Sequence, residues 1–256
     1  MGDRVRGAWV AAGVAAVAFA LATAPAAAAT RASGRFSYTS IRPGSVTGMV
    51  FDFHFHNRDD PSAKPPAVAQ MVVRTPPGSR VDVTARPQCH ASDIELRLEG
   101  PAACPASAKV GTGLAIADSG RVGANHMMST NDVVNFNGED GVIGAAVDRE
   151  YPFIKNVDHT RIAGNTSTTV FPVFPGLPPP DSYTALVSIH AQFPPLVGAD
   201  RRPWARTPRT CPRAGYWATT ATFTYQDGAV ESIQSHSRCK AKKPRKQLRK
   251  RRPSRR

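Results

Sequence analysis

The chain has 256 residues, a formal net charge of +14 and four cysteines. This length accommodates one large all-β domain or two small ones packed together. No two cysteines have C-x-x-C spacing, which argues against a cytosolic zinc cluster. The positive charge is concentrated at the C-terminal end, and the rest of the chain is close to neutral, so the composition does not indicate a specific nucleic-acid-binding domain.

Residues 1–29 have the pattern of a signal peptide. Arginines near the start precede an apolar, alanine-rich run at 8–29, and small residues follow in A-x-A registers. We expect cleavage after Ala26 or Ala29. The alternative is an uncleaved signal anchor, because the run approaches the ~20 residues of a membrane helix. No later segment is apolar enough to span a bilayer, so we expect an exported chain without a further transmembrane segment.

Short strands are predicted throughout residues 30–239. Runs rich in β-branched and aromatic residues are separated by Gly, Pro, Asn-Gly or Asp-Gly. No long helical period interrupts them, which predicts an all-β, antiparallel sandwich, either one large unit or two packed subdomains with a boundary near 115–130. The predicted strand segments are residues 34–40, 44–57, 67–85, 108–118, 132–148, 159–174, 182–194 and 215–235.

The four cysteines of an exported chain predict two disulfides. Sequence alone allows three connectivities, and we favour the local pairs Cys89 with Cys104 and Cys211 with Cys239. Closing loops of this size stabilises a fold by ~3 kcal/mol each in the chain-entropy model. The second pair would close a hairpin near its open end, opposite the Asp-Gly turn at 227–228.

A short helix is predicted between the first two cysteines. Ser92 and Glu95 form an S-x-x-E capping box, and Gly100 provides a C-terminal stop. The alternating apolar residues of segment 94–98 would equally suit a strand.

Residues 240–256 form a polybasic tail with two prolines and almost no apolar residue. Such a run cannot bury enough surface to fold, so we predict a disordered arm. Its charge favours anionic cell-wall polymers or lipid headgroups over a specific nucleic acid, and the alternative is a solvated tail without a specific partner. The predicted polyanion-binding residues are Lys240, Lys242, Lys243, Arg245, Lys246, Arg249, Lys250, Arg251, Arg252, Arg255 and Arg256.

The segment FDFHFH, residues 51–56, carries the most specific chemical hypothesis. In a strand, Asp52, His54 and His56 would line one face and the phenylalanines the other. This H-x-H pattern is similar to the zinc-binding strand of the α-carbonic anhydrases, which continues with tryptophan and takes a third histidine from a neighbouring strand. Here asparagine follows, and His190 is the best candidate for the third zinc ligand. We favour the alternative, an ordinary half-buried strand whose phenylalanines fill the core.

Other catalytic patterns are weaker. There is no G-x-S-x-G motif and no spacing of Ser, His and Asp that suggests a triad, so no catalytic residue is predicted. The acidic residues Glu139, Asp140, Asp148, Glu150 and Asp158 could serve calcium binding or glycoside hydrolysis, but we favour a solvated loop face.

Carbohydrate binding is a further alternative. Trp204, Tyr216 and Trp217 lie near one another in sequence, and exposed aromatic rings on a sandwich can stack against sugars. Buried tryptophan is commoner, and we expect Trp217 to pack in the core.

Several short motifs resemble those of uncharacterised exported proteins of high-GC Gram-positive bacteria. The motifs are PQC, ACPASAKVGTG, VNFNG, TCPRAGYWATTATFTYQDG and SRC, and the resemblance covers roughly residues 45–239. It implies a secreted β-rich domain with disulfides at these positions and no known activity. The polybasic tail departs from the family by being longer and more basic.

These patterns together favour a secreted or cell-envelope-associated β-sandwich protein. We expect a structural or binding module, held to anionic envelope polymers by its tail, rather than an enzyme. The alternatives are a zinc-dependent hydro-lyase or hydrolase and a carbohydrate-binding module.

Overall fold

The computed structural model describes residues 30–122, 125–172 and 183–240. The predicted signal peptide, and the predicted tail beyond Lys240, lie outside these residues. Within the described ranges no helix is long and apolar enough to cross a membrane. The strands are β1 (Ala32–Tyr38), β2 (Met49–Phe55), β3 (Val68–Arg74), β4 (Arg80–Val81), β5 (Lys109–Val122), β6 (Asn125–Asn137), β7 (Gly141–Asp148), β8 (Lys155–Ala163), β9 (Thr166–Val170), β10 (Ala185–Phe193), β11 (Ala205–Arg206), β12 (Tyr216–Tyr225) and β13 (Val230–Arg238).

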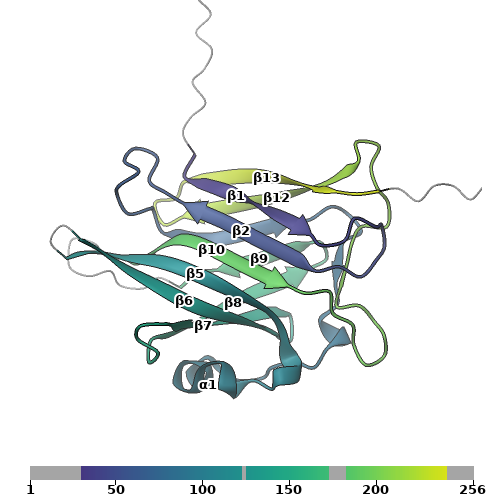
Figure 1. Ribbon diagram of the computed structural model, residues 1–256, viewed down its shortest axis with the longest axis horizontal. Helices are drawn as coiled ribbons and strands as arrows, with labels where there is room; N and C mark the ends of the chain where they lie inside the picture. The colour runs from purple at the N-terminus through teal and green to yellow at the C-terminus, as the bar shows by residue number, and fades with distance from the viewer. Residues whose placement is uncertain (1–29, 123–124, 173–182, 241–256) are drawn as a thin grey trace, which may run out of the picture.

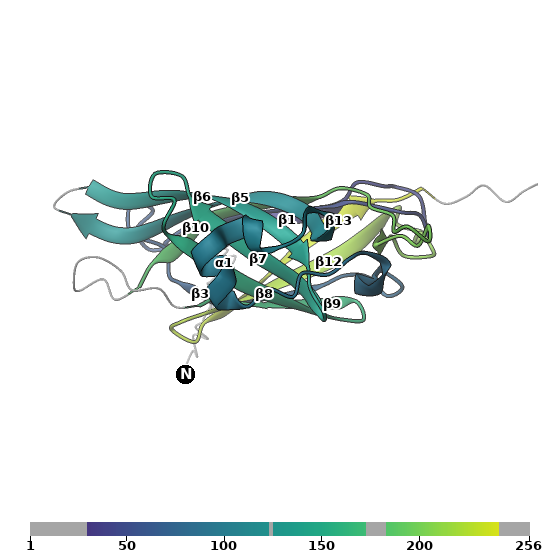
Figure 2. The ribbon, with the colours of Figure 1, turned by 90° about the horizontal axis from the view of Figure 1, so that it is seen from below.

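Eleven strands form one antiparallel sheet in the order β1-β2-β10-β5-β6-β7-β8-β9-β3-β12-β13, and β4 pairs with β11. The sheet folds over itself, so that β10, β5 and β6 lie in one layer and β8, β9 and β3 in the other (Figure 2). The antiparallel, sandwich-like fold predicted from the alternating pattern is therefore confirmed. The segment 115–130 lies within the β5–β6 hairpin.

The two ends of this strand order, β1 and β13, lie side by side (Figure 1). The Phe36 amide donates to Ser235 Oγ at 3.0 Å, and the Tyr38 amide donates to Ser237 Oγ at 3.2 Å. Serine hydroxyls at alternate positions of β13 thus satisfy donors on an edge strand that would otherwise be open to pairing with another chain. Side-chain hydrogen bonds therefore close the two layers on this side.

Large aromatic side chains fill the space between the layers near this seam. Phe53 is completely buried, and the rings of Phe53 and Phe55 each lie 5.2 Å from that of Phe223 in edge-to-face contact. Trp217 is also buried, as its place in the last hairpin predicted. The main core is therefore aromatic and densely filled at the β2–β12 side.

The predicted helix is present as α1 (Asp93–Glu99) between Cys89 and Cys104. Ser92 and Glu95 form the complete capping box, and Gly100 ends the helix at a φ of 68°, where a side chain would be strained. The helix places Leu96 in a small second core against the outer face of β6, β7 and β8. Three short 3-10 turns flank this region: Val83–Ala85, Gly100–Ala103 and Ala106–Ala108.

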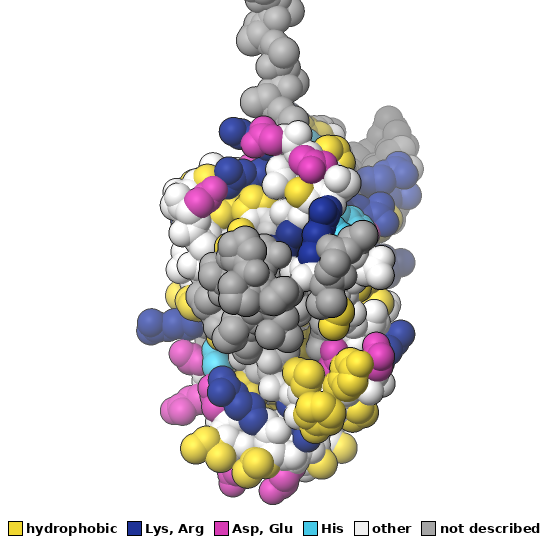
Figure 3. All heavy atoms as spheres, turned by 90° about the vertical axis from the view of Figure 1, so that its left-hand side faces the viewer, with side chains coloured by type: hydrophobic (Ala, Val, Ile, Leu, Met, Phe, Trp, Pro, Cys, Tyr) yellow, Lys and Arg dark blue, Asp and Glu magenta, His cyan; other side chains and the backbone are white. Residues whose placement is uncertain are grey.

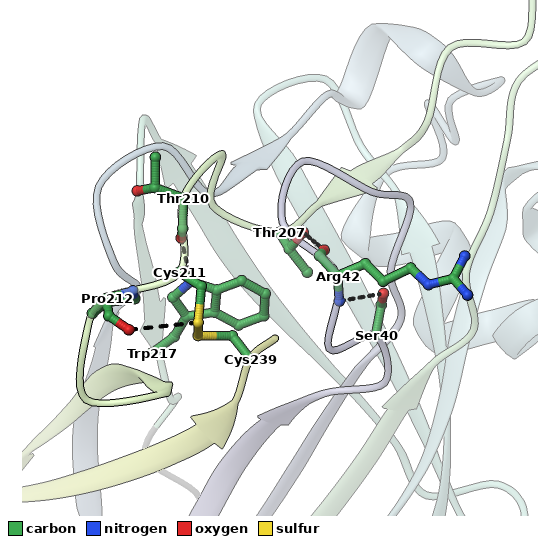
Figure 4. The surroundings of a disulfide bond; sticks show 8 residues. All are labelled: Ser40, Arg42, Thr207, Thr210, Cys211, Pro212, Trp217 and Cys239. Carbon is green, nitrogen blue, oxygen red and sulfur yellow. Dashed lines mark hydrogen bonds between the residues drawn. A yellow bond between two sulfur atoms is a disulfide. The ribbon is translucent and has the colours of Figure 1, made fainter. Parts of the chain in front are cut away.

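Both predicted disulfides are present, Cys89–Cys104 and Cys211–Cys239. The second closes the open end of the β12–β13 hairpin next to Trp217, whose indole nitrogen donates to the Thr210 carbonyl at 2.7 Å (Figure 4). The Cys211–Cys239 disulfide therefore joins the end of β13 to the segment before β12, and this segment holds the indole of buried Trp217 through the Thr210 carbonyl.

Candidate functional site

A cavity of about 430 Å³ lies between the two layers. Its size falls within the range of small-molecule sites in proteins. One part of its wall is apolar and includes Phe51, Phe53, Met71, Ile189 and Phe193. The other part carries amides, hydroxyls and carboxyls on β6, β7 and β8: Asn131, Asn135, Asp148, Asn156, Asp158 and Thr160.

The cavity exists because the inward positions of β5 and β7 carry small residues. Ala115 and Ala117 of β5 and Ala146 of β7 line it, whereas the corresponding inward positions of β2 carry phenylalanine. The aromatic side chains fill the interior at one end of the sandwich, and the alanines leave it open at the other. The small inward side chains therefore account for the cavity at this end of the interior.

The polar wall is organised around one row of three residues. Asn135 on β6 pairs in register with Gly144 on β7, which pairs in turn with Asp158 on β8. Neighbouring strands are about 4.8 Å apart, so the Asn135 and Asp158 backbones lie roughly 10 Å apart. A Cβ atom at Gly144 would collide with the Asp158 carboxyl group, so the carboxyl leans across the glycine. The carboxyl therefore occupies the space over Gly144, and the part of the cavity between this carboxyl and the Asn135 amide is called the recess below.

The amide nitrogen and the carboxyl of this row have no hydrogen-bond partner among the described residues. The Asn135 side chain is 7% exposed, and its amide nitrogen has no hydrogen-bond partner in the described part of the chain. The Asp158 carboxyl likewise has no donor among the described residues, and it keeps partial exposure because it borders the cavity. Buried polar groups are normally paired, because leaving one unpaired costs about 1–3 kcal/mol.

Burial raises the pKa of the Asp158 carboxyl from 3.8 to about 6, and nearby His159 partly opposes this shift. His159 points to the outer face, where its Nε2 atom lies 2.7 Å from Asp93 Oδ1 of α1. The Asp158 carboxyl is therefore ionised at neutral pH, but in surroundings that disfavour its charge.

Several other polar groups of the wall have hydrogen-bond partners. Asp148 Oδ1 accepts from the backbone amides of Glu150 and Tyr151, each at 2.8 Å. The hydroxyls of Thr160 and Thr169 lie 2.7 Å apart. Asn135, Asn156 and Asp158 are the amide and carboxyl side chains of the wall without a hydrogen-bond partner among the described residues, and Asn135 is the most deeply buried of the three.

The cavity reaches the surface beside the β7–β8 loop. Ile154 lines the cavity and is also 42% exposed. Tyr151 and Phe153 of the same loop are exposed, with ring centroids 6.0 Å apart. Figure 3 shows hydrophobic side chains gathered in a patch on the face at this end of the molecule. Exposed apolar side chains therefore border the cavity where it opens to solvent, and an apolar ligand can contact them there.

The histidines of the predicted zinc site lie on the opposite face of β2 from this cavity's phenylalanines. As predicted, Phe53 and Phe55 point inward and His54 points outward. His190 of β10 lies opposite Asp52, so that His54 Nε2 and His190 Nδ1 lie 3.5 and 3.7 Å from the same Asp52 oxygen. His56 follows the end of β2.

The structure thus brings His190 next to the H-x-H strand, although sequence gave no sign of this proximity. The described residues nevertheless include no group of three or more His, Cys, Asp or Glu side chains that could hold a metal ion. Two imidazoles directed at one carboxylate lack the three-ligand geometry of a catalytic zinc. The zinc site at His54, His56 and His190 stays a prediction.

The aromatic residues considered for sugar binding are mostly buried. Trp204 and Trp217 are 0% and 1% exposed, and the Trp204 indole donates to Asn137 Oδ1 at 2.9 Å. Tyr216 is exposed and lies against His236. The two tryptophans therefore offer no external stacking surface.

The sequence interpretation missed the role of the acidic residues. Asp148 and Asp158 were expected on a solvated loop face, but Asp148 ends β7, Asp158 lies within β8, and both face the cavity. The available signal was the alternation Asn156, Asp158, Thr160, which places three polar residues on one face of a strand. Because inward residues are usually apolar, this polar face appears solvent-directed in the sequence.

No protein-family model, curated protein sequence or solved structure matches the chain. The resemblance to exported proteins of high-GC Gram-positive bacteria stays a prediction. Function is therefore inferred from the residues of this chain alone.

Proposed function

We propose that this protein is a binding module that encloses a small organic ligand between the layers of its sheet. The observation that carries the proposal is the cavity of about 430 Å³ with an apolar wall and polar groups, among them Asn135 and Asp158, that have no partner in the described part of the chain. Ligand sites are typically concave and mostly apolar, with a few placed polar groups that set orientation. A water molecule occupies about 30 Å³ of liquid, so the cavity has the volume of roughly 14 water molecules, which is enough for a small organic ligand.

The experiment is a titration with N-phenylnaphthylamine, a neutral fluorophore whose emission rises in apolar surroundings. The protein is expected to bind it saturably at about one site. Ala146→Phe places a phenyl group in the cavity and is expected to weaken binding at least tenfold. Ala218→Phe adds the same group at an exposed position of β12 and is the matched control. Equal binding by both variants would mean that the fluorophore binds the surface, and the proposal would then be abandoned.

The cysteines and the N-terminal segment support an extracellular compartment for this binding module. The two disulfides suggest an oxidising, extracellular environment. The signal-peptide pattern of residues 1–29 supports secretion, and the basic residues of 240–256 support retention at anionic envelope polymers or lipid headgroups. The module is therefore proposed to hold its ligand outside the cell or at its surface.

A further inference from the structure

The charges around the cavity have one sign. Among the described residues that line it, the ionisable ones are Asp148, Asp158 and His190, and none is lysine or arginine. Two backbone amides satisfy Asp148, and the His190 ring is directed at Asp52. Asp158 is the remaining charge, and it has no cation near it in the lining.

An ionised carboxyl in such a place disfavours some ligands and favours others. An anionic ligand would bring a second negative charge into a region of low dielectric, where like charges repel strongly. A neutral hydroxyl can donate to Asp158 but leaves its charge uncompensated. A protonated amine compensates the charge and forms a charge-assisted hydrogen bond, which is about twice as strong as a neutral one.

The neighbouring amide adds a second requirement. The Asn135 nitrogen is a donor and needs an acceptor, which an ammonium group cannot supply. The Asp158 carboxyl leans across Gly144 toward the Asn135 strand, so a short head group with donor and acceptor on adjacent carbons can address both side chains. An amine next to a hydroxyl or carbonyl oxygen has this arrangement.

We propose that the ligand is an amphipathic organic cation whose protonated amine pairs with Asp158, whose adjacent oxygen accepts from Asn135, and whose apolar body contacts the phenylalanine wall. This inference rests on the proposed function and names the ligand class of the same cavity. The head group lies in the recess between the Asp158 carboxyl and the Asn135 amide, and the body extends toward Phe51 and Phe53.

The test uses three molecules with the same phenylbutyl body: phenylbutylamine, phenylbutanol and phenylbutyrate. Their affinities are measured at pH 7.5 by displacement of N-phenylnaphthylamine and by calorimetry. The amine is expected to bind at least about tenfold more tightly than the alcohol, and the acid more weakly than both. In Asp158→Asn, which keeps the shape of the side chain, the preference for the amine is expected to fall below threefold while the alcohol binds as before.

A fourth molecule tests Asn135. Phenylbutylamine with a hydroxyl on the carbon next to the amine-bearing carbon is expected to bind several-fold more tightly than phenylbutylamine itself. Asn135→Ala should remove that difference without removing the preference for amine over alcohol. An equal gain in wild type and in Asn135→Ala would refute the role of the amide.

The outcomes separate this inference from the proposed function. If the fluorophore and the alcohol bind in an Ala146→Phe-sensitive manner but the amine binds no better than the alcohol, the binding module stands and the cation proposal is overturned. If neither the fluorophore nor any phenylbutyl compound binds, both are overturned. Retention of the amine preference in Asp158→Asn would also overturn the assignment of Asp158.

Discussion

Replacing Asp158 by asparagine is expected to stabilise the ligand-free protein at neutral pH. Burial raises the pKa of this carboxyl from 3.8 to about 6, which means that the folded state disfavours its charge. Each pKa unit corresponds to 1.36 kcal/mol, so the cost of ionisation in the folded state is at most about 3 kcal/mol. The carboxyl borders the cavity, where water can screen it, and the gain is expected to lie below that limit.

The pH dependence of this gain follows from the direction of the shift. Between about pH 4 and pH 6 the folded state binds more protons at Asp158 than the unfolded state does, so the contribution of this group to the free energy of unfolding falls as the pH rises. Above about pH 7 the contribution stays constant. The stability difference between Asp158→Asn and wild type should therefore be largest near pH 8 and fall below about 1 kcal/mol at pH 4.

Urea unfolding of both proteins at several pH values between 4 and 8 measures this difference, with the disulfides intact. Asp148→Asn is the matched control, because it makes the same chemical change on the same wall at a carboxyl that accepts from two backbone amides. It should lower the free energy of unfolding by about 1–2 kcal/mol, through weaker hydrogen bonds to the loop. If Asp158→Asn were destabilising at pH 8, or if its effect did not change with pH, the carboxyl would not be buried without a partner.

Three further measurements test other parts of the molecule. Replacing Cys211 and Cys239 together by serine is expected to lower the free energy of unfolding by about 3–4 kcal/mol in denaturant titrations, because the closed loop spans 28 residues; a loss below 1 kcal/mol would contradict the chain-entropy account. If the zinc prediction holds, the dialysed protein contains about one zinc per chain by elemental analysis and loses it when His54 and His56 become alanine; metal-free wild type refutes it. Replacing the basic residues of 240–256 by glutamine should release the protein from cell walls in a sedimentation assay, and unchanged retention would exclude the tail as the anchor.

Much of the architecture was predictable because it depends on local patterns. The capping box at Ser92 and Glu95 specifies the start of a helix without any contact from distant parts of the chain, and the structure contains this capping box. The Asp227-Gly228 turn predicted that the two strands on either side of it pair. The cysteines at the open end of the same hairpin then predicted the disulfide that joins them. Strand order was not predicted, because β10 inserts between β2 and β5 through contacts that no local pattern encodes.

The cavity depends on that strand order and was therefore not predictable. Small inward residues such as Ala117 and Ala146 are visible in the sequence, but a hollow forms only if the opposing layer does not fill it. The pairing of β6, β7 and β8 brings Asn135 and Asp158, separated by 23 positions, to either side of Gly144. Neither residue carries a motif, so only the register makes them a site.

Asn135 and Asp158 depart from the rule that buried polar groups are paired. A fold selected for stability alone would place an apolar residue at position 158, because an unpaired ionised carboxyl in the interior is destabilising. The same is true of the amide of Asn135, which is 7% exposed and unpaired in the described part of the chain. Residues that weaken the free protein in this way tend to occur at functional sites, since a bound partner can offset the cost. The two departures share one recess and have complementary needs, a donor at Asp158 and an acceptor at Asn135, so a single bound head group would satisfy both.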